Sequence, residues 1–561
     1  MRPSSLLLGA SVFALAVAQG GCDTKGFGKP YSGLRLVVEL RSAPRGPIVD
    51  QRADNSAVLG STLTPLDLSV DAPQPFHVVV RALDQNGNTD ARFNGYVRIS
   101  AKPGAIEPIA APDADGRNIK LTNGESPDFE VKLSNAYGTT YIVADDLGYA
   151  PADPLAKPPP VCANGRDDDG DGTIDFPADE GCAFANDNSE GGGTYEQGAS
   201  VPIFYRLPRV ADVRGLTCVS SATPGEAPSC SGSGKTPYPK EQLFLDTGYH
   251  QKRDPADGAR YSEFDFDMVV TRIASDGFYV SDVKDTRGGF NGIFAFNFNA
   301  PPRMRVCDRL KTFAGTATEF FGLTQISYPT WTLEEWDPQK RPCGVPEPTV
   351  FGPADVSHVD PNTGNLAVPT TLLPLTGSLV RALSADGVSV MVTPKFGPGP
   401  MPCVDETGKP LPTQECIDNP KSTFIPKVDA GTDCDLIADG RIDFTAGSAE
   451  ERCSRTCSLD AECTEYSNFA ARSTFRLTIK DQNVAGAIQA DATTSAEFKP
   501  LEMKGKPLKA FTGTLHFFSG GSQYTIEARC KDDIVVDLNA QPLPSDKACV
   551  FPRTVVDENP Q

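Results

Sequence analysis

The stretch from Phe264 to Ser327 reads FDFDMVVTRIASDGFYVSDVKDTRGGFNGIFAFNFNAPPRMRVCDRLKTFAGTATEFFGLTQIS and decides the fold class. It contains five short runs in which apolar and polar residues alternate, and Gly, Pro, Asn or Asp separates each run from the next. This alternation is typical of half-buried antiparallel strands. Five such strands suggest a small barrel. The predicted strands are 267–273, 277–282, 292–298, 310–319 and 323–327.

A family resemblance is carried by four motifs of this stretch: DGFYVSD (276–282), GIFAFNF (292–298), CDRL (307–310) and GTATEFFGLTQI (315–326). They resemble the OB-fold domain that precedes the catalytic domain in bacterial secreted nucleases of the endonuclease/exonuclease/phosphatase superfamily. Cys307 stands where that family usually has glycine. The catalytic domain of those nucleases does not follow in this sequence, so the resemblance implies an OB barrel without the nuclease.

A shorter motif of this stretch recurs near the end of the chain. Residues 310–316 (LKTFAGT) are similar to residues 508–514 (LKAFTGT). We therefore expect a first OB-like domain over 199–345, a linker over 346–370 and a second, degenerate OB-like domain over 371–550. A Cys-rich insertion at about 398–470 interrupts the second domain. After an opening segment at 377–392, its predicted strands are 475–481, 485–490, 508–516 and 523–528.

Length and composition set the broad class. The 561 residues, with 51 Gly and 49 Pro among many short strand patterns, indicate a mostly β chain with several domains. The formal net charge is −21. Nucleic-acid binding depends on clustered Lys and Arg, so this charge argues against a nucleic-acid partner and suits a surface exposed to calcium.

The N-terminus predicts export. An apolar run, 6–18, has the length of a signal-peptide hydrophobic region and is too short to span a bilayer. Two cleavage sites compete: an ordinary one at 16–18, and a lipobox-like QGGC at 19–22. Acylation of Cys22, with palmitate among the expected fatty acids, leaves 14 of the 15 cysteines to pair. We therefore predict a signal peptide over 1–21, a lipidated tether over 22–31 and attachment to an envelope membrane, with the leaflet open.

The next region, 32–150, contains evenly spaced short strand patterns, which indicate a β-sandwich. Its segments ALDQNGN (82–88) and AYGTTYIVAD (136–145) are similar to bacterial immunoglobulin-like domains of adhesins and surface proteins. That family supplies spacing and binding surfaces. A Pro-rich linker, 151–161, marks the end of this domain.

The sharpest motif is CANGRDDDGDGTIDFPADEGC, residues 162–182. Aspartates at alternate positions followed by glycine aim several carboxylates at one point, as hard Ca²⁺ requires. The motif resembles thrombospondin type 3 and dockerin calcium loops more than a full EF-hand. The alternative is a solvated acidic linker, and a flexible segment continues to residue 198. The predicted ligands are the side chains of Asp167, Asp169, Asp171 and Asp175 and the carbonyl of Thr173.

Two details of the calcium prediction stay open. The last ligand position of an EF-hand corresponds to Ala178, so closure of the loop falls to Asp179 or Glu180. A second, weaker copy, DGRIDF at 439–444, lies near Asp439, but the acidic residues before it are out of register.

Cysteines in an exported chain are expected to form disulfides. Connectivity does not follow from spacing, so pairing of sequence neighbours is a guess. The short spacings among Cys434, Cys453, Cys457 and Cys463 leave a four-thiolate zinc site as an alternative. The candidate pairs are Cys162 with Cys182, Cys218 with Cys230, Cys307 with Cys343, Cys403 with Cys416, Cys434 with Cys453, Cys457 with Cys463, and Cys530 with Cys549.

The first OB-like domain carries aromatic and basic residues that could suit single-stranded nucleic acid. We expect Phe294, Phe296 and Phe298 to share one strand face and to be core residues instead. The basic residues then only offset acidic surroundings, and binding of single strands should be weak or absent. The full set is Phe278, Phe290, Phe294, Phe296, Phe298, Arg272, Arg287, Arg303, Arg305, Arg309 and Lys311.

The sequence contains no GxSxG elbow, no HExxH pair and no GxGxxG loop after a strand, so enzymatic activity is not expected. Its four histidines are dispersed. The prediction is a lipid-anchored, calcium-binding envelope protein that binds or scaffolds an envelope protein or a polysaccharide. The first alternative is a nucleic-acid-binding partner or remnant of a secreted nuclease, and the second is an unrecognised hydrolase.

Overall fold

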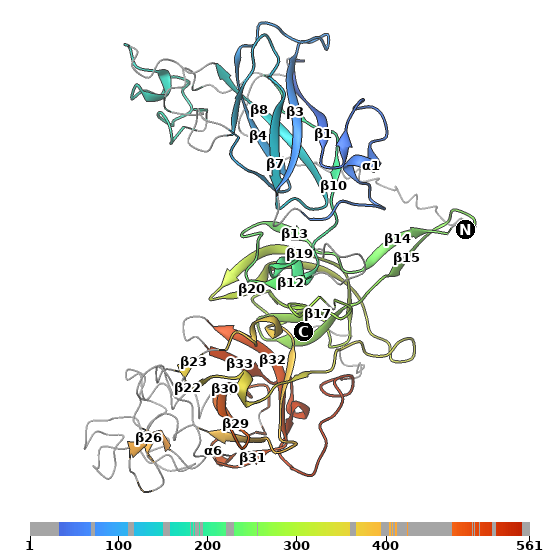
Figure 1. Cartoon of the computed structure of the whole chain (residues 1–561), viewed down its shortest axis with the longest axis vertical. Coiled ribbons are helices and arrows are strands. Elements are labelled where there is room, and N and C mark those ends of the chain that lie inside the picture. The colour runs from blue at the N-terminus through green and yellow to red at the C-terminus, as the bar shows by residue number, and fades with distance from the viewer. Residues whose placement is uncertain are drawn as a thin grey trace, which may run out of the picture. The chain divides into compact units, whose positions relative to one another are not determined.

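The computed structural model forms two compact units, Met1–Tyr205 and Arg206–Gln561, and the chain is mostly β (Figure 1). Each unit is described by itself. The structure describes residues 33–68, 73–109, 117–149, 157–179, 181–182, 185, 190, 195–219, 229–254, 256–285, 287–359, 366–367, 369–393, 403–404, 407, 410–411, 423–424, 474–495, 497–498, 500–503, 505–518 and 523–551.

The first unit is built from two sheets. One has the order β2-β1-β3-β7-β5, and the other has the order β10-β8-β4-β6, with β9 also paired to β8. A short helix, α1 (Ser56–Leu59), lies between β2 and β3 in sequence. The strands are β1 (Arg35–Ala43), β2 (Gly46–Pro47), β3 (Gln74–Leu83), β4 (Gly95–Lys102), β5 (Ala105–Ile106), β6 (Asn118–Lys120), β7 (Phe129–Ser134), β8 (Thr139–Tyr149), β9 (Gly198–Ala199) and β10 (Ile203–Phe204).

One hydrophobic core joins these two sheets. Val38 and Val78 from the first sheet and Val97 and Ile142 from the second belong to the same cluster of buried residues. The residues between them along each strand are more exposed, as in the alternating burial of β1. Alternation therefore places one face of each sheet in the core, because successive strand residues point to opposite faces.

The end of the first unit differs from the sequence prediction. We expected the first OB-like domain to begin at residue 199, but β9 and β10 both pair antiparallel with β8. Tyr205 is buried in the same core. β9 and β10 follow the acidic loop in sequence and pair with a strand that precedes it. A local sequence pattern does not indicate such a long-range pairing.

The second unit contains a closed ring of five strands. β16 pairs with β17, β17 with β18, β18 with β20 in parallel, β20 with β19, and β19 with β16. The predicted strands are present, although β18 ends two residues early and β20 continues to Glu334. The strands are β16 (Met268–Ala274), β17 (Gly277–Asp282), β18 (Gly292–Phe296), β19 (Arg309–Phe320) and β20 (Leu323–Glu334).

A second ring follows the same order. The path runs β24-β32-β33-β30-β29-β25, with β30 and β33 parallel, and a short turn connects β24 to β25. The repeated motif lies in matching strands, since 310–316 falls in β19 and 508–514 spans β31 and β32. The strands are β24 (Leu379–Leu383), β25 (Ser389–Thr393), β29 (Thr474–Lys480), β30 (Ala485–Asp491), β31 (Pro507–Leu508), β32 (Ala510–Phe518) and β33 (Gln523–Glu527).

Short elements surround the two rings. The hairpin formed by β14 and β15 extends away from the first ring (Figure 1). The others include β13 at the edge of the first ring and β21 and β34 at the edge of the second. Their bounds are α2 (Val210–Val213), β11 (Leu216–Val219), β12 (Ser229–Gly232), β13 (Gln242–Phe244), β14 (Tyr249–Arg253), β15 (Arg260–Phe264), β21 (Thr349–Val350), β22 (His358–Val359), β23 (Leu366–Ala367), β26 (Cys403–Val404), β27 (Pro410–Leu411), β28 (Thr423–Phe424), α6 (Pro500–Met503) and β34 (Ile534–Val535).

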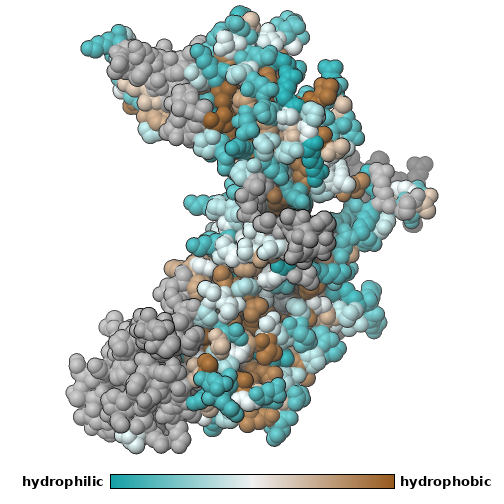
Figure 2. Space-filling model, in the orientation of Figure 1, coloured by the Kyte–Doolittle hydropathy of each residue, from teal (hydrophilic) through white to brown (hydrophobic). Residues whose placement is uncertain are grey.

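Four of the expected disulfides are present: Cys162–Cys182, Cys218–Cys230, Cys307–Cys343 and Cys530–Cys549. The other three candidate pairs, the alternative zinc site, Cys22 and the second acidic loop near Asp439 fall outside the residues whose side chains are described. No helix within the described ranges is long and apolar enough to cross a membrane. On the face drawn in Figure 2, hydrophobic residues occur in small groups among hydrophilic ones.

Candidate metal centre

The predicted calcium loop is closed by the disulfide between Cys162 and Cys182, whose Cα atoms are 5.8 Å apart. A single 3-10 turn, Val161–Ala163, leads into it. Gly170 and Gly172 have φ values of 81° and 95°, which glycine adopts without the steric cost that other residues have. The two glycines let the chain reverse direction within the acidic run.

The acidic side chains of this run hold the turn together. Asp167 accepts hydrogen bonds from the backbone N–H of Gly170 at 2.6 Å and of Gly172 at 3.1 Å. Asp171 accepts from the N–H of Thr173 at 2.7 Å. The hydrogen bonds from the Thr173 hydroxyl and N–H lower the pKa of Asp171. These hydrogen bonds therefore favour the ionised form of Asp171.

Asp175 has a different position from the one that its spacing indicates. Its carboxylate accepts the N–H groups of Asn164 at 3.0 Å and Gly165 at 2.7 Å, at the start of the loop. Its own φ is 51°, in the left-handed region. Asp175 is absent from the groups of described side chains whose ligand atoms converge. It fastens the two ends of the loop to each other.

Two acidic residues lie where the loop closes. Asp179 is 2% exposed, and its Oδ1 accepts the N–H of Gly181 at 2.6 Å. Glu190 is also 2% exposed and accepts the N–H groups of Asp168 and Asp175. Asp179 was one of the two residues considered for closing the loop, whereas Glu190 was placed in a flexible segment. Only its acidic character amid Gly, Ser and Asn could have indicated its role.

These side chains form two adjoining groups of carboxylates. One group is Asp167, Asp169 and Glu190, and the other is Asp169, Asp171 and Asp179. Within each group, one oxygen of every residue lies within 4.8 Å of the others. Asp169 thus lies near two other predicted ligands, Asp167 in one group and Asp171 in the other. The groups are completed by Glu190, which the spacing did not indicate, and by Asp179, a candidate for closing the loop.

Electrostatics in this cluster are unfavourable without a cation. Burial raises the pKa of Asp179, and the nearby charges of Asp171, Asp169 and Glu190 raise it further. Oδ2 of Asp179 is buried and has no hydrogen-bond partner among the described residues. A buried carboxylate oxygen without a donor is costly, and a hard divalent cation would satisfy it. The residues present therefore fit Ca²⁺.

The aromatic residues of the first ring divide between core and surface. Phe278 and Phe290 are buried. Of the predicted core residues, Phe294 is buried and Phe296 is partly buried. Phe298 was also expected in the core, but this prediction is wrong because the side chain is 59% exposed. The strand ends at Phe296, and Phe298 has a φ of 61°, so the period-two alternation does not continue to it.

Three of the six basic residues of the first ring are already paired with acidic residues. Arg272 forms an ion pair with Glu527, Arg287 with Asp285 and Asp212, and Arg309 with Asp267 and Glu334. Lys311 lies over the ring of Tyr249 at 5.5 Å. The charges of Arg272, Arg287 and Arg309 are thus neutralised within the chain, which leaves fewer free cations for a nucleic-acid backbone.

His250 lies in the β14–β15 hairpin between two carboxylates. Its Nδ1 is 2.7 Å from Asp265 Oδ2, and its Nε2 is 3.0 Å from Asp246 Oδ1. Burial by itself would lower the pKa of this imidazole, but the hydrogen bonds and charges of Asp265 and Asp246 outweigh burial and raise the pKa. The ring is therefore held more readily in its protonated form.

We expect the β14–β15 hairpin to lose stability as the pH rises. A histidine whose pKa is higher in the folded state than in the unfolded state stabilises the fold when it is protonated. This stabilisation is complete below the unfolded-state pKa of about 6.5 and is lost as the pH rises through the folded-state pKa. Amide-exchange protection factors in these strands should thus be larger at about pH 6 than at about pH 9. The His250→Gln variant should lose this difference. The same pH dependence in that variant would assign it to another group.

No protein-family model matches the chain, and no curated protein matches it. The candidate metal centre therefore rests on its own geometry.

Proposed function

We propose that this chain is a lipid-anchored, calcium-binding protein of the cell envelope that acts by binding or scaffolding. The observation that carries the proposal is the pair of converging carboxylate groups between Asp167 and Glu190, with the unpartnered oxygen of Asp179 beside them. Extracellular calcium is plentiful compared with cytosolic calcium, so a site of modest affinity suffices in that compartment.

The arrangement of strands supports the domain interpretation within this proposal. We interpret the first unit as an immunoglobulin-like sandwich, because its two antiparallel sheets share one core. We interpret the two rings of the second unit as OB-like barrels. The first ring closes through five strands, the second follows a path of six strands whose ends are joined by the short turn between β24 and β25, and each contains one parallel pair, β18 with β20 and β30 with β33. Both kinds of domain commonly serve as binding modules.

The cysteines support export and the lipid anchor. Four disulfides are typical of a protein that folds in an oxidising compartment. They use eight of the 15 cysteines, and the seven that remain are an odd number. Acylation of Cys22, at the end of the predicted signal peptide, leaves six cysteines that can pair with one another.

We propose that bound calcium holds Glu190 against the loop that carries Asp167, Asp169 and Asp171. The cation replaces repulsion among Asp167, Asp169, Asp171, Asp179 and Glu190 with attraction to a common centre. Glu190 also accepts hydrogen bonds from the loop backbone, so coordination and the closing of the segment are coupled.

Calcium should bind the full-length protein with one titratable transition at this loop. Because the ion binds the folded state, it should stabilise the first unit by about 2.7 kcal/mol when free calcium is about 100 times the dissociation constant. Titration calorimetry measures the binding, and scanning calorimetry with calcium or with a chelator measures the stabilisation. The double variant Asp169→Ala with Asp171→Ala should lose both signals.

The structure also defines a control for this titration. Asp54→Ala with Glu130→Ala removes the same two charges from exposed positions of the first unit and should bind calcium like the wild type. Glu190→Gln should weaken binding more than Asp175→Asn, because Glu190 belongs to a converging group and Asp175 does not. Absence of binding heat at millimolar calcium, or equal binding by the Asp169/Asp171 variant, contradicts the calcium proposal.

A further inference from the structure

A pocket of about 460 Å³ lies in the second unit, away from the acidic loop. This volume falls within the range of about 300–1,000 Å³ that is usual for small-ligand sites. The segment before β19, the segment after β20 and the segment after Cys549 form its walls. The side chains that matter here are Arg303, Arg305, Glu335, Trp336, Lys340 and Phe551.

The walls of the pocket are fixed by contacts within the protein. The carboxylate of Asp308 accepts the N–H of Arg305 at 2.8 Å and the N–H of Trp336 at 2.7 Å, so it joins two walls. The disulfide Cys307–Cys343 ties the same two segments together, and Cys530–Cys549 holds the third. A pocket that is already formed does not use binding energy to order its own loops.

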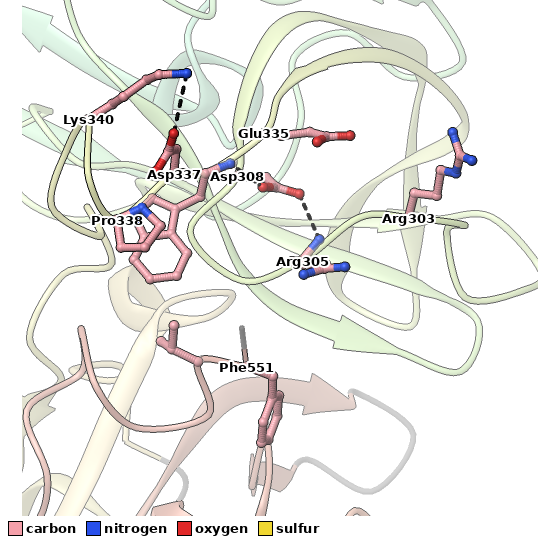
Figure 3. A pocket seen from close by; sticks show the side chains of 10 residues that line it. Arg303, Arg305, Asp308, Glu335, Asp337, Pro338, Lys340 and Phe551 are labelled. Atoms are coloured by element: carbon pink, nitrogen blue, oxygen red, sulfur yellow. Dashed lines mark hydrogen bonds and ion pairs between the residues drawn. The ribbon is translucent and has the colours of Figure 1, made fainter. Parts of the chain in front are cut away.

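Aromatic side chains provide a flat apolar surface. The indole N–H of Trp336 donates to the carbonyl of Arg341 at 3.2 Å, so the polar edge of the ring is already satisfied by the protein. Trp336 is only partly buried against the neighbouring core cluster. Phe551, across the pocket in Figure 3, is 63% exposed. Both aromatic side chains are thus accessible to a ligand.

The charges around this surface balance. Arg303 and Arg305 lie on one side in Figure 3, Asp337 and Lys340 on the other, and Glu335 between them. With Asp308, the lining contains three basic and three acidic residues, and Lys340 pairs with Asp337 at 3.3 Å. Arg303 has no ion-pair or hydrogen-bond partner among the described residues. The pocket therefore offers fixed donors and acceptors with no net charge.

We propose that this pocket binds a neutral sugar ring of a glycan. A sugar presents an apolar C–H face that packs on Trp336, and its hydroxyl groups donate to carboxylates and accept from guanidinium groups. A polyanion would need an excess of positive charge, and an acyl chain would need an apolar lining. The proposal rests on the proposed binding function at the envelope and names its ligand as polysaccharide.

The neighbouring cavity extends the same site. It has a volume of about 200 Å³ and shares Arg305 and Phe551 with the first pocket. Its other lining residues include Ile273, Met304, Val306 and Arg529. A ligand that continues past Arg305 therefore has room for more than one ring, which favours an oligosaccharide over a single sugar.

Trp336 allows a direct test on the full-length protein. The chain has two tryptophans, Trp331 and Trp336. Trp331 packs against Phe278 with ring centroids 5.1 Å apart, so Trp331→Phe retains an aromatic contact and leaves Trp336 as the only reporter. The probes are four neutral tetrasaccharides, derived from cellulose, amylose, β-1,3-glucan and chitin, and the acidic tetragalacturonate. At least one neutral probe should change the Trp336 fluorescence saturably.

Calorimetry with the same probe assigns the binding to the pocket. Arg305→Gln and Glu335→Gln should each weaken binding about tenfold, because each removes hydrogen bonds to a charged group. Phe298→Ala is the matched control, since it removes an exposed aromatic side chain of the same ring outside the pocket. This control should bind like the wild type.

Three results would overturn the proposal. The first is no fluorescence change with any neutral probe at about 10 mM, which is weaker than typical specific binding. The second is tighter binding of tetragalacturonate than of every neutral probe. The third is loss of binding in Phe298→Ala together with unchanged binding in Arg305→Gln and Glu335→Gln. These failures are separate from failure of the calcium proposal, which is measured at Asp169 and Asp171 and does not involve Trp336.

Discussion

Asp533→Ala should lower the free energy of unfolding of the second unit by about 3–5 kcal/mol, because it breaks a buried ion pair by removing one partner. Asp533 and Arg529 have side chains that are each 1% exposed. The carboxylate accepts the Arg529 backbone N–H at 2.9 Å, its Nε at 2.9 Å and its Nη2 at 2.8 Å. Nη1 is already buried without a partner among the described residues.

A double variant shows whether the destabilisation of Asp533→Ala comes from the buried charge that is left unpaired or from the lost packing contacts. Arg529→Met with Asp533→Leu removes both charges together, so it should be much less destabilised than Asp533→Ala. Asp337→Ala breaks an exposed pair with Lys340 and should cost about 1 kcal/mol or less. Scanning calorimetry of the full chain measures all three. A double variant as unstable as Asp533→Ala would show that the contacts, and not the isolated charge, are responsible.

Loss of the disulfide Cys307–Cys343 should have an effect of similar size. The two cysteines are 36 residues apart in sequence, and the chain-entropy model gives about 4 kcal/mol for a loop of this length. The bond also joins two walls of the glycan pocket, so its removal should weaken binding of the neutral tetrasaccharide as well. Scanning calorimetry of Cys307→Ala with Cys343→Ala measures the loss of stability.

The conformation of Cys307 provides an internal comparison. Its φ is 79°, a value that glycine adopts at little cost and that is unfavourable for other residues. Cys307→Gly with Cys343→Ala should therefore be about 1 kcal/mol more stable than the variant with alanine at position 307. Equal stability of the two variants would show that the backbone at this position relaxes once the disulfide is absent.

The rings of strands were largely predictable because their signal is local. Alternation of apolar and polar residues located β16, β17 and β19, and the repeated LKxFxGT motif located β32. Where the alternation stopped, the prediction failed. Phe298 follows the pattern of Phe294 and Phe296 in sequence, yet a left-handed φ turns the chain and exposes its ring. Period two has meaning only while the backbone remains extended.

In the candidate metal centre too, the spacing of the residues accounts for the positions of some carboxylates and not of others. Spacing correctly indicated that Asp169 lies near Asp167 and near Asp171, because alternate residues in a tight turn lie close together, although the three carboxylates do not share one group. The same spacing assigned Asp175 as a ligand, but its carboxylate is held by the N–H groups of Asn164 and Gly165.

The sequence by itself determined a mostly β chain, the positions of nearly all strands in the two rings and the acidic loop, whereas the four disulfide pairs were only guessed from it. Only the tertiary structure decided that Glu190 joins the acidic loop, that β9 and β10 return to the first unit, and that Trp336, Arg303 and Phe551 meet in one pocket. The physical reason is how far apart in sequence the contacting residues lie. Alternation and spacing act over a few residues, whereas these contacts form between segments that the folded backbone, and not the sequence order, makes neighbours.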